Sequence, residues 1–339
     1  MNIPEISVVI AVYNGSQYIS ETLESLVLQS FSNWECIIVD DGSTDDTIAI
    51  IQNFIDKDSR FKIIKSNGGN GPYIVANIGI KAAKGKYIAR TDADDISLPE
   101  RLQTQYNFLE SNLNITVCGS QHYYLFENNK TSLKLYNADV NFLKWQLIFR
   151  NKIVHSTMMF RKNWFENLGY YPEKRLAQDW HIWLEASHNN TLHILEKPLV
   201  KWRIHNNSIT KKESWNQLDL ASEVAVYHFI NRLNFNNIDF NIVKSILASL
   251  RGDKIESETN IAQTISFLTL VYEKVIHENN INKAIKSKIK LDLHTIIDSC
   301  FVRQSSLNKT TILLYLQTLR IAGMSKIWIK GLLRHLLKK

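Results

Sequence analysis

The chain has 339 residues, of which 45% are hydrophobic and 22% are charged, and its formal net charge is +7. This composition is typical of a globular protein with a sizeable core, and the length suits two domains. The three cysteines, Cys36, Cys118 and Cys300, are too scattered for a disulfide framework or a CxxC metal site, which favours a reducing, cytoplasmic location. No apolar run approaches the length of a membrane span, and Ile6–Val12 is too short for the core of a signal peptide.

The first ninety residues alternate apolar strands with amphipathic helices. Strands are predicted at residues 6–12, 36–39, 61–64 and 86–89, and helices at 19–27, 47–55 and 72–83. Continuous apolar strands that alternate with helices predict an α/β fold with a mostly parallel central sheet, flanked by helices on both faces. No GxGxxG follows the first strand and no GxxxxGK[ST] occurs, so the sequence supports neither a dinucleotide-binding fold nor a P-loop.

Polar clusters follow three of these strands: Tyr13-Asn14 the first, Asp40-Asp41 the second and Asp92–Asp95 the fourth. Ligands bind at the carboxyl ends of the strands in such sheets, so we expect a binding site at this edge. The carboxylates of Asp92–Asp95 favour a divalent cation, because Mn2+ or Mg2+ takes carboxylate oxygens and keeps positions open for phosphate. The alternative is a solvated acidic turn that caps the helix starting near Pro99.

The pattern is less regular from residue 100 to about 212 and becomes helical from about 215 onward. We therefore predict an α/β domain at residues 1–212, a helical C-terminal domain at 213–320 and a basic amphipathic helix at 321–339. Residues 320–339 contain six lysines or arginines and no acid, which leaves about one net positive charge elsewhere and excludes uniform nucleic-acid-type basicity. We expect this last helix to lie on an anionic membrane surface; the alternative is packing of its apolar side on residues 215–320.

Six stretches of the sequence resemble the family 2 glycosyltransferases, in family order, over about residues 5–212. They are SVVIAVYNGSQYISETLESLVLQSF, IIVDDGSTDDT, GKYIARTDADDISLPERL, VHSTMMFRK, QDWHIW and KPLVKWRIHNNSIT. The resemblance implies the GT-A fold, whose Rossmann-like sheet binds a nucleotide sugar. Within the family, IARTDADD and the basic C-terminal helix resemble bacterial lipooligosaccharide glycosyltransferases of the beta-1,3-N-acetylglucosaminyltransferase type.

This resemblance implies roles for residues at the first two strand ends. Asp41 would accept a hydrogen bond from the base of the nucleotide, whereas the alternative for Asp41 is an N-cap of the following helix. Ala11, Tyr13 and Asn14 would line the base and ribose pocket, with the Tyr13 ring available for stacking.

Asp92 and Asp94 match the two acids of the family's DxD motif. The resemblance implies that Asp92 contacts the ribose or its metal-bound environment and that Asp94 ligates the metal on the diphosphate. His205 would be a further ligand of the metal or would meet the pyrophosphate; its alternative is a structural histidine. Asp95 is predicted to cap the next helix. Arg90 would hold a carboxylate or a phosphate oxygen near the nucleotide; its alternative is a structural ion pair with Asp92.

Asp179 resembles the family's catalytic base, which removes the proton of the acceptor hydroxyl during inverting transfer. The sequence has Gln178 where the family usually has Glu, and the alternative for Asp179 is a helix N-terminal acid favoured by the dipole. Arg203 would neutralise the leaving diphosphate. His155 and Trp180 would contact the acceptor, with core packing as the alternative for Trp180.

Together these features predict an inverting, metal-dependent, non-processive glycosyltransferase. It would move a hexose or N-acetylhexosamine from a UDP-sugar to a glycan or lipid-linked glycan acceptor in bacterial surface polysaccharide synthesis, peripheral on the inner face of the cytoplasmic membrane. One alternative is a non-catalytic sugar-nucleotide or glycan-binding protein, against which the retained site residues argue. Another is a sugar nucleotidyltransferase, which calls for a Gly-rich basic loop after the first strand.

Overall fold

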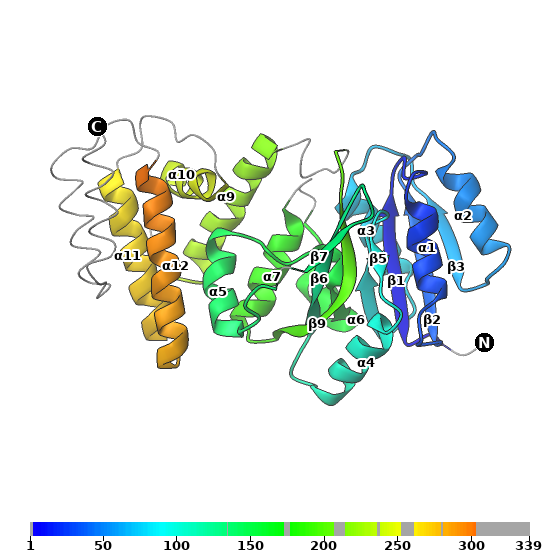
Figure 1. Cartoon of the computed structure of the whole chain (residues 1–339), viewed down its shortest axis with the longest axis horizontal. Coiled ribbons are helices and arrows are strands. Elements are labelled where there is room, and N and C mark those ends of the chain that lie inside the picture. The colour runs from blue at the N-terminus through cyan, green and yellow to red at the C-terminus, as the bar shows by residue number, and fades with distance from the viewer. Residues whose placement is uncertain are drawn as a thin grey trace. The chain divides into compact units, whose positions relative to one another are not determined.

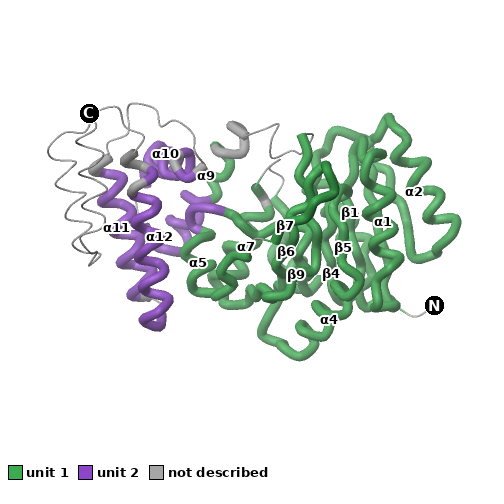
Figure 2. The backbone as a smooth tube through the Cα atoms, viewed as in Figure 1, with its two compact units in different colours: residues 1–147, 151–224 green, residues 148–150, 225–339 purple. Residues whose placement is uncertain are grey.

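The structure is a computed structural model that describes residues 3–133, 135–172, 177–206, 214–235, 238–251, 261–278 and 281–302. The chain divides into two compact units, residues 1–147 with 151–224 and residues 148–150 with 225–339 (Figure 2). The predicted domain boundaries near residues 212 and 320 stay predictions. The predicted basic helix at 321–339 lies outside the described residues.

The first unit begins with the predicted alternation of strands and helices (Figure 1). Its elements are β1 (Ile6–Val12), α1 (Ile19–Val27), β2 (Trp34–Asp40), α2 (Thr47–Ile55), β3 (Phe61–Lys65), α3 (Pro72–Ala82) and β4 (Tyr87–Arg90). Strand β1 lies between β2 and β4, β3 flanks β2, and all three pairs are parallel. The predicted α/β fold is confirmed, and the carboxyl ends of these strands share one edge.

Later strands extend the same sheet and introduce antiparallel pairs. The elements that follow are β5 (Ile96–Ser97), α4 (Arg101–Ser111), β6 (Val117–Phe126), β7 (Thr131–Leu133), α5 (Val140–Phe149), the 3-10 helix η1 (His155–Thr157), β8 (Met159–Arg161), α6 (Lys162–Leu168), α7 (Gln178–His188) and β9 (Leu192–Ile204). Within the described residues, nine strands form one sheet in the order β3-β2-β1-β4-β8-β6-β9-β5, with β7 on β6. Because β5 pairs antiparallel with β9, the acidic residues before β5 lie alongside the end of β9.

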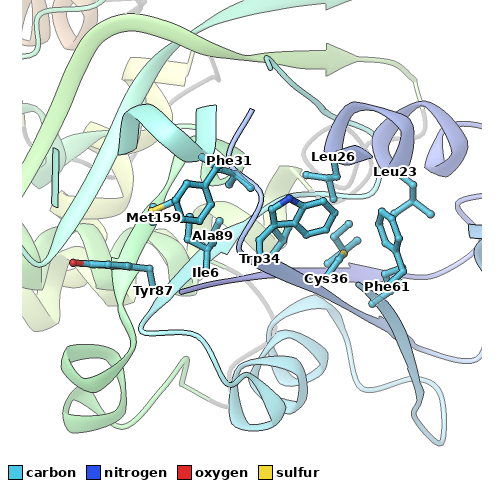
Figure 3. Packing of buried hydrophobic residues seen from close by; sticks show 14 of the residues in the cluster. Ile6, Leu23, Leu26, Phe31, Trp34, Cys36, Phe61, Tyr87, Ala89 and Met159 are labelled. Atoms are coloured by element: carbon cyan, nitrogen blue, oxygen red, sulfur yellow. The ribbon is translucent and has the colours of Figure 1, made fainter. Parts of the chain in front are cut away.

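Both faces of the central strands are buried, which explains their uninterrupted apolar sequence. Ile6 and Ile10 of β1 belong to a core cluster that includes Leu23 on α1 (Figure 3). Val9 alternates to the other face, where α3 packs on β1. A Cβ added to Gly79 of α3 would lie 2.6 Å from Cγ1 of Val9, so glycine permits this close approach.

The C-terminal part of the described chain is helical. It contains α9 (Ser214–Asn231), α10 (Phe240–Arg251), α11 (Ile261–Glu278) and α12 (Lys283–Val302). Helix α12 packs against α10 and α11, and buried side chains of these three helices include Val243, Leu268 and Ile289. None of the helices in the described ranges is both long enough and apolar enough to cross a bilayer.

Candidate active site

The loops that follow β1 and β2 are bonded to each other at the shared strand edge. The N–H of Asn14 donates to Oγ of Ser43 (2.9 Å), and Oδ1 of Asn14 accepts from the N–H of Thr44 (2.8 Å). Asn14 has a φ of 49°, a left-handed conformation that asparagine tolerates better than most residues. Tyr13 is 62% exposed and Ala11 is partly exposed. Asn14 therefore shapes the loop, while the Tyr13 ring stays open to solvent.

Asp41 follows β2, and its carboxylate holds the glycine-rich segment at residues 66–71. Its Oδ1 accepts from Oγ of Ser66 (2.6 Å) and Nδ2 of Asn70 (3.0 Å), and Oδ2 accepts from the N–H groups of Asn70 (3.0 Å) and Gly71 (2.9 Å). Burial works to raise the pKa of Asp41, but these bonds together hold it below its ordinary value. The carboxylate is therefore ionised, and it bonds this segment rather than capping α2.

The acidic loop that follows β4, residues 91–95, lies against the end of β9. Oδ2 of Asp94 lies 2.8 Å from Nε2 of His205, although the two residues are 111 positions apart in the chain. The pairing of β5 with β9 brings them together. Within the described ranges, no group of three or more His, Cys, Asp or Glu side chains is placed to hold a metal. The protein therefore offers a two-residue oxygen and nitrogen pair at this point.

Asp95 does not cap the next helix, so that prediction is wrong. Its carboxyl is fully buried and accepts a hydrogen bond from the N–H of Arg203 on β9 (2.8 Å), whereas α4 begins at Arg101 without a side-chain cap. Burial raises the pKa of Asp95 well above its ordinary value, and the neighbouring carboxylates add to this effect. The Asp95 carboxyl therefore bonds the backbone of β9 instead of the first turn of α4.

The guanidinium of Arg203 is buried and engaged with the acidic loop. Its Nε donates to the carbonyl oxygen of Asp94 (2.8 Å) and a terminal nitrogen donates to Glu21 on α1 (2.7 Å). It also lies over the ring of Tyr18, 4.6 Å from the centroid. In this structure Arg203 fixes the backbone of the metal-ligand candidate Asp94.

Two further buried arginines stabilise the acidic loop. Arg90 donates to the carbonyl oxygen of Val9 (2.6 Å) and forms an ion pair with Asp92 (3.3 Å). This is the structural ion pair that was given as the alternative for Arg90. Arg101 donates to the Thr91 hydroxyl (2.9 Å) and to the carbonyl oxygen of Arg90 (2.6 Å). No motif in the sequence marked Arg101. Its position was the one unusual feature: Arg101 lies in the first turn of a helix, where the helix dipole disfavours a positive charge.

Asp179 lies in the first turn of α7, where two side chains from other elements bond its carboxylate. The Tyr73 hydroxyl donates to Oδ1 (3.3 Å) and Nδ2 of Asn151 donates to Oδ2 (2.9 Å). Burial raises the pKa of Asp179 to about 6; Asp92 adds to the rise, and the hydrogen bonds oppose it. Such a carboxylate is ionised at neutral pH yet basic enough to take a proton. No sequence motif marked Tyr73 or Asn151.

His155 and Trp180, the predicted acceptor contacts, are both buried. Nε1 of Trp180 donates to the carbonyl oxygen of Leu147 (2.6 Å), so the core packing stated as its alternative describes this indole. Nε2 of His155 lies 2.6 Å from the Tyr171 hydroxyl. Burial, aided by the charge of Arg90, lowers the pKa of His155 well below its ordinary value, so the imidazole is neutral. His155 lies behind the site rather than on its surface.

The sequence profile of the family described as Glycosyl transferase family 2 matches residues 7–169. An uncharacterized glycosyltransferase of Haemophilus influenzae is 30% identical over 256 residues, which are 72% of this chain and 79% of that protein. Uncharacterized glycosyltransferase MJ1057 of Methanocaldococcus jannaschii is 31% identical over 251 residues, which are 71% of this chain and 85% of that protein.

Solved structures share the fold. Staphylococcus aureus TarS 1-349, in complex with UDP-GlcNAc, has a TM-score of 0.57 and 20% identity over 88% of this chain and 90% of that one. The mannosyltransferase PcManGT from Pyrobaculum calidifontis, in complex with GDP-Man and Mn2+, has a TM-score of 0.51 and 14% identity, covering 89% and 87%. The predicted GT-A fold is confirmed, and by its relatives and its profile match this chain belongs to glycosyl transferase family 2.

Proposed function

We propose that this chain is an inverting, metal-dependent, non-processive glycosyltransferase that moves a hexose or N-acetylhexosamine from a UDP-sugar to a glycan acceptor. One observation carries the proposal: the fold holds three carboxylates in three different surroundings. Hydrogen bonds keep the pKa of Asp41 below its ordinary value, Asp94 lies 2.8 Å from a histidine nitrogen, and burial raises the pKa of Asp179 to about 6. These surroundings suit nucleotide binding, metal binding and proton removal, respectively.

The donor would bind across the ends of β1, β2 and β4. Asp41 would accept the N–H of the base, Tyr13 would stack on it, and Asp92 would contact the ribose. UDP-GlcNAc in TarS supports a nucleotide sugar as the ligand. Arg90, as the partner of Asp92, would hold that carboxylate toward the ribose.

Asp94 and His205 fit a divalent cation in their chemistry. Mn2+ and Mg2+ bind through few protein ligands and complete their shells with phosphate oxygens and water, so a carboxylate oxygen beside an imidazole nitrogen suits them. The Mn2+ in PcManGT supports this choice. The bound cation would offset the charge of the diphosphate leaving group. Arg203 would contribute by holding the backbone of Asp94 in place and by adding positive charge.

Asp179 would act on the acceptor. Its ionised carboxylate would take the proton of the acceptor hydroxyl while that oxygen forms a bond to the anomeric carbon, and the bond from that carbon to the diphosphate breaks on the opposite face. The proton then resides on Asp179 and the electron pair on the UDP product. We propose that the acceptor belongs to a bacterial surface polysaccharide and is carried on a lipid at the cytoplasmic membrane. His155 would support the acceptor side from behind, through Tyr171.

The test is a panel of UDP- and GDP-sugars, each with and without Mn2+, with two measurements on the full chain: the melting temperature and nucleotide release. We expect one or a few UDP-sugars to stabilise the protein in the presence of Mn2+ and to be cleaved to UDP. Stabilisation without any release, with oligosaccharide acceptors present, would favour the non-catalytic binding protein. If no nucleotide sugar stabilises the chain or is cleaved, the proposal is wrong.

A further inference from the structure

The carboxylate of Asp179 is bonded on both oxygens by side chains from two separate parts of the fold. The hydroxyl of Tyr73 on α3 donates to one oxygen, and the amide of Asn151, just after α5, donates to the other. A carboxylate held at both oxygens cannot rotate about its last torsion without losing a bond. Resting on the function proposed above, we propose that Tyr73 and Asn151 are positioning residues that orient Asp179 for removal of the acceptor proton.

Tyr73 is anchored by the helix on which it lies. One turn further along α3, Asn77 exchanges two hydrogen bonds with the backbone of Tyr171: its Nδ2 donates to the carbonyl oxygen (2.9 Å), and its Oδ1 accepts from the N–H (3.0 Å). The Tyr73 ring also packs against the rings of Tyr171 and His155, at centroid distances of 5.3 Å and 6.0 Å. These contacts leave the Tyr73 hydroxyl few directions other than toward Asp179.

The amide of Asn151 is oriented by its own loop. Its Oδ1 accepts a hydrogen bond from the N–H of Ile153 (2.9 Å). With the oxygen engaged there, the opposite side of the amide presents only donors, and these suit an ionised carboxylate rather than a protonated one. Asn151 therefore favours the form of Asp179 that can act as a base.

Charged groups around Asp179 act in opposite directions. Burial and the Asp92 carboxylate raise its pKa, whereas hydrogen bonds from the backbone N–H of Trp180, from Tyr73 and from Asn151 lower it. Burial and the carboxylates of Asp179 and Asp92 raise the pKa of Tyr73 well above its ordinary value, and the positive charge of Arg90 opposes this rise. The Tyr73 hydroxyl therefore keeps its proton and remains a donor throughout the range in which Asp179 titrates.

The experiment measures the titration of Asp179 directly by 13C NMR of the full chain labelled at its aspartate carboxyl carbons. The Asp179 signal is the one that disappears in Asp179→Asn. Tyr73→Phe keeps the ring and removes the hydroxyl, so we expect the titration midpoint to move up by about one to two pH units, the loss of one hydrogen bond to a charged group. Asn151→Asp keeps an acceptor for Ile153 but places a second carboxylate beside Asp179, and we expect a larger upward shift.

Tyr171→Phe is the matched control. It removes a hydroxyl from the same ring cluster, one that bonds His155 rather than Asp179. We expect the midpoint to stay close to the wild-type value, because the bonds from Tyr73 and Asn151 to Asp179 remain in place. Midpoints unchanged in Tyr73→Phe and Asn151→Asp, or moved equally in Tyr171→Phe, overturn the proposal. Because no substrate is involved, this outcome is independent of whether the chain transfers a sugar.

A kinetic measurement completes the test. With the UDP-sugar that wild type cleaves, we expect the acid limb of the pH profile of kcat/KM to move up in Tyr73→Phe together with the NMR midpoint, so that activity recovers at higher pH. A loss of the same factor at every pH, with the acid limb in place, would assign Tyr73 a purely structural role. Activity retained in Asp179→Asn would instead refute the proposed function and leave the NMR result standing.

Discussion

Replacement of Arg101 by methionine tests how the acidic loop is held. Arg101 is fully buried, and burial lowers its pKa only to about 10, so it is charged at neutral pH. Its guanidinium donates to the hydroxyls of Thr91 (2.9 Å) and Ser97 (2.8 Å) and to the carbonyl oxygen of Arg90 (2.6 Å). Methionine fills a similar volume but leaves these acceptors unpaired and removes a positive charge near the buried Asp95.

Breaking a buried charged network by removing one partner costs about 3–5 kcal/mol of the free energy of unfolding. For a unit of this size that loss corresponds to a decrease in melting temperature of roughly 6–20 °C. Arg101→Lys, which keeps the charge but cannot form the same fork of hydrogen bonds, should give an intermediate decrease. Circular dichroism melts and urea denaturation at pH 7.5 measure both variants.

Arg60→Met is the matched control. Arg60 forms an ion pair with the carboxylate of Asp58 at 2.6 Å, and its side chain is 30% exposed. An exposed pair of this kind contributes no more than about 1 kcal/mol. If Arg101→Met melts within the range of Arg60→Met, the acidic loop does not depend on a buried arginine.

Three further predictions concern the site and the C-terminus. Asp179→Asn should still bind UDP but should no longer cleave the UDP-sugar to UDP. In wild type, the rate of UDP release should rise with pH through about 6, because the ionised carboxylate is the base and burial raises its pKa to about 6. A flat pH profile there would contradict the assignment. Asp94→Ala and His205→Ala should each abolish the gain in UDP affinity that Mn2+ gives wild type in calorimetry; an undiminished gain in both would exclude this pair as the metal ligands. Deletion of residues 322–339 should reduce flotation with anionic liposomes, and unchanged flotation would show that this segment does not bind the membrane.

Periodicity was sufficient for the first half of the sheet. The apolar runs of β1 to β4 are continuous because both of their faces are covered, and helices of the right length separate them, so parallel order followed from the pattern. The later strands do not have this regularity. Strand β8 has three residues and β5 has two, and their antiparallel pairing depends on neighbours distant in the chain.

Local reasoning failed where a distant partner was stronger. Asp95 precedes a helix, which made a cap the natural prediction, yet the pairing of β5 with β9 places the N–H of Arg203 within 2.8 Å of its carboxyl. Trp180 was predicted to contact the acceptor, with core packing as the alternative, and its indole N–H donates to the backbone carbonyl oxygen of Leu147. Neither partner lies near its residue in the sequence.

The order of residues specifies the chemistry available to this protein: carboxylates after apolar strands, an acid in the first turn of α7 and a histidine at the end of β9. How those groups are paired depends on the folded arrangement. It placed Asp94 beside His205, committed Arg203 to the acidic loop and bonded Asp179 to Tyr73 and Asn151. A side chain's residue type sets which bonds it can make, whereas its partner depends on strand register and helix packing, because these contacts join residues 28 to 111 positions apart in the chain.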